Sequence, residues 1–359
     1  MNLPIVYLAA LLAAFAGSAI LTAIVKKVAV KINFVAHPRQ DRFHKSIIPL
    51  GGGIAIFATI ALFCITVAIF VKISPLDNIH LKDFASKTGE LLIIIACSAV
   101  LFALGLWDDI KNLNPPIKLF VQFSAAFCAA YFADVRVELF IESKIITSII
   151  SSVWIVLIIN VFNFLDNMDG ASAGIALIAT IILFFAAAMS GQIFVAGFAL
   201  VFAGALAGFL VFNFFPASIF MGDAGSFVVG FFVALITLRT TYYQSGQTNE
   251  WYVVLMPLVI MALPLYDFIS VTLLRIKQGK SPFVGDTQHF SHRLKKRGLT
   301  ETQTVLTLYL ATLATGLGAI ILKIVNSTYG LLVFFQIVLV LAIVAILEST
   351  EKNDAANQQ

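Results

Sequence analysis

The chain has 359 residues, of which 60% are hydrophobic and only 12% are charged. A soluble protein carries about 25% charged residues, and apolar runs of 18 or more residues recur along this sequence. The composition therefore excludes a soluble enzyme and indicates a membrane protein built from helices. The apolar runs are continuous rather than alternating, which argues against a β-barrel. The net charge of +4 follows membrane topology and gives no reason to expect nucleic acid as a partner.

Run length and spacing predict an all-α, polytopic integral membrane protein with about eleven transmembrane helices. The expected spans are 4–25, 51–72, 90–107, 117–134, 145–164, 170–189, 193–212, 225–240, 251–273, 303–323 and 329–347. With the N-terminus outside and the C-terminus in the cytoplasm, 16 of the 23 lysines and arginines fall on the inner side, as the positive-inside rule requires. We expect residues 1–347 to form a single transmembrane domain and residues 348–359 to form a short, disordered cytoplasmic tail.

The first predicted cytoplasmic loop contains "HPRQDRFHKSIIPLGGG", which is basic and then rich in glycine. His44 and Lys45, with the arginines before them, are suited to bind a phosphate group. The three glycines favour a closely packed start of the next helix over a loop that cradles a ligand.

The third span ends in "LGLWDDIKNLNPPIKLFVQ". On a helix, Asp108 and Asp109 point about 100° apart, and their mutual repulsion is relieved by a divalent cation, for which oxygen ligands favour Mg²⁺. Lys118 and Gln122 follow as i, i+4 neighbours on the next span. A solvated helix end with a local Asp–Lys pair explains this segment equally well.

The fifth span ends in "NVFNFLDNMDG". Asn160, Asn163 and Asp166 recur every three residues and share one broad helix face, while Asp169 has turned further around the helix. Amides inside a membrane need a hydrogen-bond partner or a wet cavity, so we expect these groups to line a site. Hydrogen bonding between helices is the alternative, and it is most plausible for Asn160.

The motif "FNFFPASIFMGDAGS" precedes the eighth span and carries Asn213, Phe220 and Asp223. The small residues after Asp223 permit either a ligand or another helix to approach the backbone. The first N–H groups of the span are available to an anion, and Asp223 acting as the N-cap is the alternative.

Two further motifs lie in the region of the ninth span and the loop after it. "PLYDFIS" places Asp267 inside the span, and an ionisable group there suggests a functional role that the sequence does not specify. In "HFSHRLKKRG", His289, His292 and Arg293 are placed to meet phosphate, whereas the following lysines fit an ordinary cytoplasmic loop. A zinc site is a poor explanation because no cysteine lies nearby.

In the predicted topology, the acidic groups of these separate segments fall on the cytoplasmic side, except for Asp267, which lies inside its span. Phosphoryl transfer requires groups of this kind at one site: carboxylates, a divalent cation and basic side chains. The membrane setting suggests a lipid phosphate as one substrate. The rival hypothesis is a secondary transporter, whose carboxylates belong near the bilayer midplane.

In their order along the chain, these motifs resemble those of the polyprenyl-phosphate N-acetylhexosamine-1-phosphate transferases of the glycosyltransferase 4 type, and most closely the bacterial undecaprenyl-phosphate GlcNAc-1-phosphate transferases. The resemblance implies that a UDP-N-acetylhexosamine, with GlcNAc the expected sugar, gives its sugar 1-phosphate to undecaprenyl phosphate and releases UMP. This step would be the first membrane step of a cell-envelope polysaccharide pathway. It implies Mg²⁺ as the cofactor, with Mn²⁺ as an alternative.

The resemblance also implies a role for each matching position. The implied catalytic residues are Asp108, Asp109, Asp166, Asp169, His289 and His292. The implied substrate-binding residues are Asn160, Asn163, Asn213, Phe220, Lys118, Arg293, His44 and Lys45, and the implied metal ligands are Asp223, Asp109 and Asp166. The implied setting is the lipid bilayer of the bacterial inner membrane, with the site facing the cytoplasm. The resemblance does not decide whether the protein forms a homodimer.

Three departures from the family pattern leave the exact sugar open. Asn167 replaces a glycine, Ser291 replaces a histidine, and Ala36 replaces an acid of the first loop. The histidine loop also lacks the triple histidine of the phospho-MurNAc-pentapeptide transferases of peptidoglycan synthesis, which argues against that alternative substrate.

Overall fold

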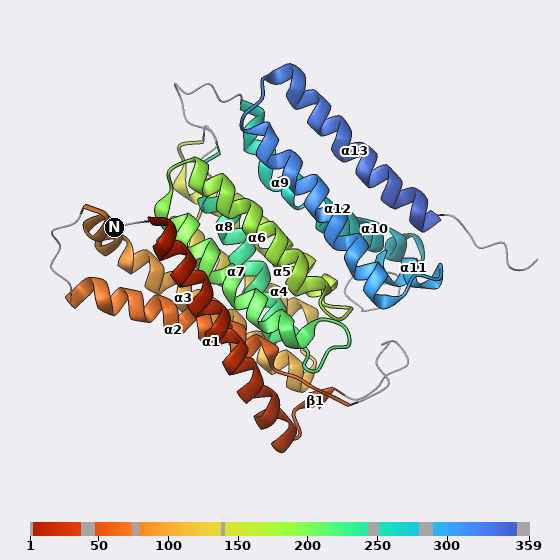
Figure 1. The fold of residues 1–359 in the computed structure, drawn as a ribbon, viewed down its shortest axis with the longest axis horizontal. Helices are drawn as coiled ribbons and strands as arrows, with labels where there is room; N and C mark the ends of the chain where they lie inside the picture. Colours follow the sequence, from red (N-terminus) through yellow and green to blue (C-terminus); the bar gives the residue numbers. More distant parts are fainter. Residues whose placement is uncertain are drawn as a thin grey trace, which may run out of the picture. The chain divides into compact units, whose positions relative to one another are not determined.

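The structure is a computed structural model that describes residues 3–36, 47–73, 79–137, 141–242, 251–279 and 290–349 (Figure 1). Two compact units are distinguished, the first formed by residues 1–38 and 44–241 and the second by residues 39–43 and 242–359. The described residues are overwhelmingly helical, so the prediction of an all-α membrane protein with many spans is confirmed.

The first unit consists of eight helices and one short ribbon. The helices are α1 (Leu3–Lys31), α2 (Gly52–Ile73), α3 (Ile79–Lys111), α4 (Pro115–Phe132), α5 (Lys144–Leu165), α6 (Ala171–Met189), α7 (Ile193–Asn213) and α8 (Gly222–Arg239). The ribbon pairs β1 (Val35–Ala36) antiparallel to β2 (Ile48–Pro49). Helix α3 begins at Ile79, well before the predicted start of the third span at 90.

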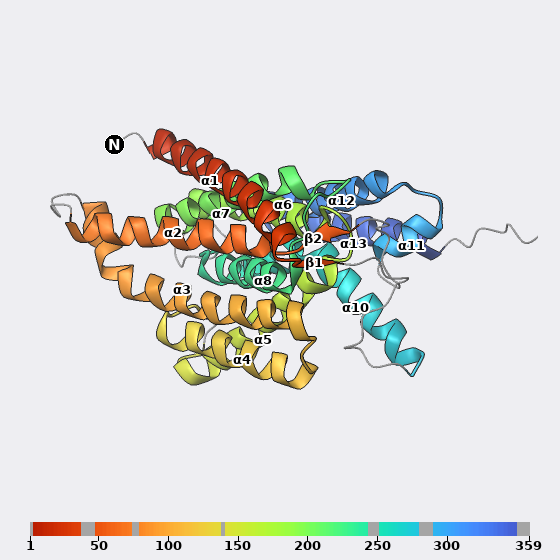
Figure 2. The same ribbon diagram turned by 90° about the horizontal axis from the view of Figure 1, so that it is seen from below.

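Helix α8 is the centre of this unit. It packs against α2, α3, α5, α6 and α7, and Figure 2 shows it between α2 and α3. A Cβ on Gly230 would lie 2.5 Å from the Cα of Ile159, so the α5 and α8 backbones approach closely. Small residues of this kind are what brings helices together in a membrane, where the hydrophobic effect does not drive their association.

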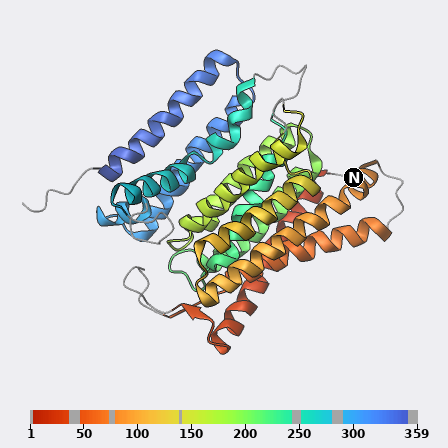
Figure 3. The ribbon, with the colours of Figure 1, turned by 180° about the vertical axis from the view of Figure 1, so that it is seen from behind.

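The outer helices of the unit pack by the same means. Ser18 of α1 donates a hydrogen bond to the carbonyl oxygen of Ala205 in α7 (2.6 Å), and a Cβ on Gly204 would lie 2.4 Å from the carbonyl oxygen of Leu11. On the opposite side, α3, α4 and α5 lie in succession, as the view from behind shows (Figure 3). The rest of each outer helix presents large apolar side chains at the surface, as expected where lipid surrounds the protein.

The second unit contains η1 (Trp251–Leu255), α9 (Met256–Ile260), α10 (Ala262–Lys277), α11 (Phe290–Lys296), α12 (Glu301–Leu322) and α13 (Ser327–Ser349). Helices α12 and α13 pack side by side (Figure 1). Thr300 and Gln303 form a capping box that begins α12. The predicted tail lies almost wholly outside the described residues.

The ninth predicted span, 251–273, was expected to be one helix, and the structure corrects this. Helices α9 and α10 meet at Met261 with a bend of 64°. The physical reason is Pro264, which has no N–H to donate to the carbonyl oxygen of Ile260 and whose ring crowds the preceding turn.

The predicted count of eleven spans is not confirmed. Nine described helices are long and apolar enough to cross a membrane, and the bent pair α9–α10 makes ten. Helix α4, the predicted span 117–134, does form, but it is short, opens with two prolines and contains Lys118 and Gln122. These polar groups lower the hydropathy of α4, which nonetheless packs against α3 and α5.

Candidate functional site

The carboxylate of Asp109, on α3, binds the first turn of α8. The backbone N–H of Asp223 donates to Oδ1 of Asp109 (2.8 Å), and the N–H of Ala224 donates to Oδ2 (3.2 Å). Gly222 has a φ of +74°, and a Cβ there would lie 2.7 Å from Oδ2 of Asp109. Two of the N–H groups that were expected to face an external anion are therefore bound by an anion of the protein itself.

Close packing of backbones surrounds this contact. A Cβ on Gly53 of α2 would lie 2.2 Å from the nitrogen of Gly225, and a Cβ on Gly105 of α3 would lie 2.5 Å from the Cα of Ala224. The small residues on both sides of Asp223 thus allow α2 and α3 to pack against α8. This favours helix packing over ligand approach for both glycine-rich motifs.

Asp108 points to the other side of α3 and is 2% exposed. Its Oδ2 forms an ion pair with Nζ of Lys118, and its Oδ1 accepts a hydrogen bond from the N–H of Leu113 (2.7 Å). The local Asp–Lys pair considered from the sequence is therefore present. The pair does not neutralise the site, because the carboxylate of Asp223 lies within hydrogen-bonding reach of that of Asp108.

Asn163, on α5, completes this cluster. Its side-chain amide donates to Oδ1 of Asp223 (2.9 Å) and to Oγ of Ser226 (3.0 Å). The ends of α3, α5 and α8 thus bring Asp108, Asp223 and Asn163 together. We call Asp108, Lys118, Asn163 and Asp223 the carboxylate cluster, in which two carboxylates face one lysine.

Asn160 is turned toward a different partner. Its amide donates to Oε1 of Gln122 on α4 (2.8 Å) and to the carbonyl oxygen of Val156 (2.8 Å). Gln122 is fully buried. The structure thus places Asn160 in the hydrogen bond between α4 and α5 that was the alternative for it.

Two predicted residues hold the loop between α7 and α8. Oδ2 of Asp169 accepts a hydrogen bond from the N–H of Ala217 (2.8 Å). Asn213 is buried, accepts from the N–H of Gly170 (3.1 Å) and donates to the carbonyl oxygen of Ile219 (2.9 Å). These contacts fix the α7–α8 loop against the α5–α6 turn, next to the carboxylate cluster.

The remaining predicted residues of the first unit lie at this same end. Phe220 is half-buried, and its backbone pairs with the carbonyl oxygen of Pro49 and the N–H of Gly52, which joins the loop to the start of α2. Asp166 ends α5 as its half-buried C-cap. Asn167, one of the departures, donates to the carbonyl oxygen of Phe164 (2.8 Å).

The second unit holds the histidine segment by two contacts. Oδ1 of Asp267 on α10 accepts a hydrogen bond from the N–H of Phe290 (2.6 Å), the first residue of α11, and Asp267 is 2% exposed. Nη2 of Arg293 donates to Oγ of Ser270 (2.9 Å). Asp267 therefore holds the start of α11, a structural role that its position in the sequence did not reveal. His44, Lys45 and His289 lie outside the described residues, as does the side chain of His292.

Sequence reasoning missed two partners of this site. The sequence analysis did not predict that Asp109 caps α8. Gly222, directly before Asp223, was the available sign that another group approaches the backbone at the start of this helix. Ser226 was noted only as a small residue, yet its hydroxyl accepts from Asn163 and donates to the carbonyl oxygen of Asp223 (3.3 Å).

The oxygen donors of the carboxylate cluster suit Mg²⁺. Within the part of the chain that the structure describes, no three His, Cys, Asp or Glu side chains converge closely enough to hold a metal by themselves. Mg²⁺ does not require three, because it is usually held by one or two carboxylates together with waters and substrate phosphates. Asp108 and Asp223, two partly uncompensated oxygen donors within reach of each other, fit that requirement.

Comparison with known proteins agrees with the motifs. The sequence model of glycosyl transferase family 4 matches residues 91–241, which contain the whole carboxylate cluster. A probable undecaprenyl-phosphate N-acetylglucosaminyl 1-phosphate transferase of Bacillus subtilis (strain 168) is 27% identical over 337 residues, which is 91% of this chain and 87% of the relative. Undecaprenyl-phosphate alpha-N-acetylglucosaminyl 1-phosphate transferases of Yersinia pestis and Escherichia coli (strain K12) are 28% and 27% identical over 303 and 300 residues, in both cases 80% of this chain and 76% of the relative. The chain is therefore similar to glycosyl transferase family 4 over residues 91–241, and to these transferases over most of its length.

Proposed function

We propose that this protein transfers N-acetylglucosamine 1-phosphate from UDP-GlcNAc to undecaprenyl phosphate and releases UMP. The named activity of the relatives supports the acceptor and the sugar. The membrane helices support a lipid acceptor, and the predicted topology supports a site that faces the cytoplasm of a bacterial inner membrane.

The observation that carries the proposal is the carboxylate cluster. Asp108 and Asp223 sit within reach of each other where α3 and α8 end and begin, with one lysine beside them and Asn163 holding Asp223. Two carboxylates facing one cation are a costly arrangement near a membrane unless a further cation binds there during function.

Mg²⁺ held by Asp108 and Asp223 would supply that cation. When bound, the metal offsets the charge of the pyrophosphate. Asp109 already accepts two backbone hydrogen bonds from the start of α8, so we assign it mainly to positioning α8. A further contribution of Asp109 or Asp166 to the metal stays a prediction.

The proposed chemistry exchanges one phosphate bond for another. An oxygen of undecaprenyl phosphate forms a bond to the phosphorus that carries the sugar, and the bond between that phosphorus and the UMP oxygen breaks. The electron pair of the broken bond leaves with UMP, and the lipid becomes a diphosphate-linked sugar. Asp108 is suited to accept a proton from the acceptor phosphate or to attack the phosphorus itself, and both roles stay open. Lys118, which pairs with Asp108, is placed to offset negative charge on a phosphate.

The histidine segment, in the second unit, also has a role in the proposed function. Asp267 and Ser270 fix the start and the middle of α11, which carries His292 and Arg293. We propose that this segment supplies the positive charge for a substrate phosphate, as the basic motif suggested.

The test is release of UMP by the purified protein in detergent with undecaprenyl phosphate and Mg²⁺. UDP-GlcNAc and UDP-MurNAc-pentapeptide are supplied separately, with and without EDTA. We expect lipid-dependent UMP from UDP-GlcNAc alone, lost with EDTA and lost in Asp223→Asn. Asp134→Asn, which changes a more exposed aspartate that pairs with Arg136, is the matched control and retains activity. Release from the pentapeptide nucleotide alone would overturn the sugar, and no release from either donor by folded protein would overturn the transferase.

A further inference from the structure

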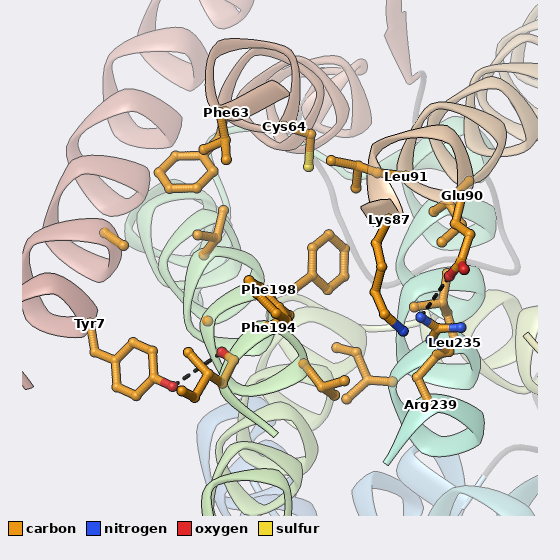
Figure 4. Close-up of a pocket in the computed structure, with 18 of the residues that line it drawn as sticks. Tyr7, Phe63, Cys64, Lys87, Glu90, Leu91, Phe194, Phe198, Leu235 and Arg239 are labelled. Carbon is orange, nitrogen blue, oxygen red and sulfur yellow. Dashed lines mark hydrogen bonds and ion pairs between the residues drawn. The ribbon is translucent and has the colours of Figure 1, made fainter. Parts of the chain in front are cut away.

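A cavity of about 270 Å³ lies at the opposite ends of α3 and α8 from the carboxylate cluster. Its walls come from the first half of α1, the second half of α2, and the adjoining parts of α3, α7 and α8 (Figure 4). All of these helices belong to the first unit. The cavity is therefore a separate feature of the same helix bundle that carries the proposed active site.

The walls are almost entirely apolar. Phe63, Cys64, Phe194 and Phe198 surround the space, and Leu235 lies on the wall formed by α8 (Figure 4). A dry apolar cavity of about 150 Å³ is already large enough for benzene. A volume of 270 Å³ with these walls accommodates a segment of hydrocarbon chain and disfavours water.

Three charged side chains line one side of this apolar space. Nη2 of Arg239 on α8 pairs with Oε2 of Glu90 on α3 at 2.8 Å, and Nη1 of Arg239 also donates to the carbonyl oxygen of Asp134 (3.3 Å). The guanidinium of Arg239 is thus already paired with groups of the protein. Lys87 lies one turn before Glu90 and lines the same cavity, with its ammonium directed toward Arg239 (Figure 4).

Lys87 differs from Arg239 because its side chain has no hydrogen-bond or ion-pair partner among the described residues, and it is exposed. The three groups sum to one positive charge. An apolar cavity with one uncompensated cation on its wall matches a molecule that has a hydrocarbon chain and an anionic head.

We propose that this cavity binds one acyl chain of an anionic phospholipid, with the lipid phosphate on the ammonium of Lys87. The lipid would fill the gap between α1, α3 and α7 at the end of the bundle remote from the carboxylate cluster. This inference does not depend on the proposed transferase activity.

The test is native mass spectrometry of the full-length protein in detergent. The protein is titrated with phosphatidylglycerol or with phosphatidylcholine of the same acyl chains. We expect the wild type to retain phosphatidylglycerol about fivefold more strongly, the factor that one lysine near a lipid phosphate supplies. Lys87→Gln abolishes this preference, while Lys72→Gln, an exposed lysine at the end of α2 that does not line the cavity, leaves it unchanged.

A second pair of variants tests the cavity itself. A Cβ on Gly197 would meet only Cε1 of Tyr7 within 4 Å, at 3.6 Å, so a larger side chain can enter the space from there. Gly197→Phe lowers retention of both lipids, and Gly197→Leu serves if the larger side chain prevents folding. Equal retention of the two lipids by the wild type, or unchanged retention in the folded Gly197 variant, would overturn the proposal. So would displacement of phosphatidylglycerol by undecaprenyl phosphate or by inorganic phosphate at equal concentration, because another phosphate source would then be the preferred ligand.

Discussion

The two ends of the α3–α8 contact are built in opposite ways. At one end, Asp109 of α3 caps α8 and the backbones of Gly105 and Ala224 approach so closely that no side chain fits between them. At the other end, an ion pair between Glu90 and Arg239 joins the two helices beside an apolar cavity. The same two helices therefore combine a rigid polar end, which suits phosphate chemistry, with a loosely packed end that suits a flexible hydrocarbon.

The largest effect is expected at the rigid end, from Asp108→Asn. The amide keeps an acceptor for the N–H of Leu113 but loses the charge that pairs with Lys118 and that proton transfer or attack on phosphorus requires. We expect UMP release to fall by about 10²-fold or more, with an unchanged unfolding midpoint in detergent. Near wild-type turnover would remove Asp108 from the proposed chemistry and leave it a structural partner of Lys118.

Packing at the two ends is compared directly by two alanine substitutions. Gly105→Ala places a Cβ 2.5 Å from the α8 backbone, so the helices must separate, and we expect a loss of about 1–3 kcal/mol or more. Gly197→Ala places its Cβ 3.6 Å from the ring of Tyr7, an ordinary contact, and we expect no loss beyond about 0.5 kcal/mol. Thermal unfolding of the two proteins side by side measures the difference. Equal stabilities would show that the two ends are packed alike.

The cap of α8 is tested by Asp109→Ala and Asp109→Asn. Alanine leaves the N–H groups of Asp223 and Ala224 without their acceptor, which we expect to cost about 2 kcal/mol. Asparagine keeps one acceptor oxygen, so we expect it to recover part of that stability. An alanine variant as stable as the wild type would show that water replaces the carboxylate and that the rigid end does not depend on it.

The smallest effect is expected from Glu90→Gln at the cavity end. Glu90 and Arg239 are both partly exposed, and such ion pairs contribute at most about 1 kcal/mol. Removing the carboxylate leaves UMP release unchanged, and it raises retention of the anionic lipid because the local charge becomes more positive. Loss of UMP release in this variant would instead link the cavity end to the proposed active site.

Local features of this protein were predictable from the sequence, and features that join distant segments were less so. Every predicted span is at least partly helical because long apolar runs leave the backbone no partner in lipid except itself. The Asp108–Lys118 pair was foreseen because a short turn separates the two residues. The bend at Met261 was missed although the two prolines around it were visible in the sequence.

The cap of α8 was beyond sequence reasoning for a geometric reason. Asp109 and Asp223 are separated by four intervening helices, and only the packing of α3 against α8 brings them together. The motif order identified which residues matter, but adjacent aspartates offer no sign of which one turns toward a helix start and which toward a lysine. Asp267 presented the same difficulty, because its partner is the backbone of Phe290 rather than a recognisable side chain.

The central position of α8 has a consequence for how the protein is made. Among the described candidate spans it is the least apolar, and most of its surface is covered by neighbours. All five helices that cover it, α2, α3, α5, α6 and α7, precede it in the chain. A nascent chain emerges N-terminus first, so all five helices that contact α8 have been synthesised before that helix leaves the ribosome. Integration of α8 into the bilayer is therefore a docking step onto an existing protein surface, more than a partitioning of a lone helix into lipid.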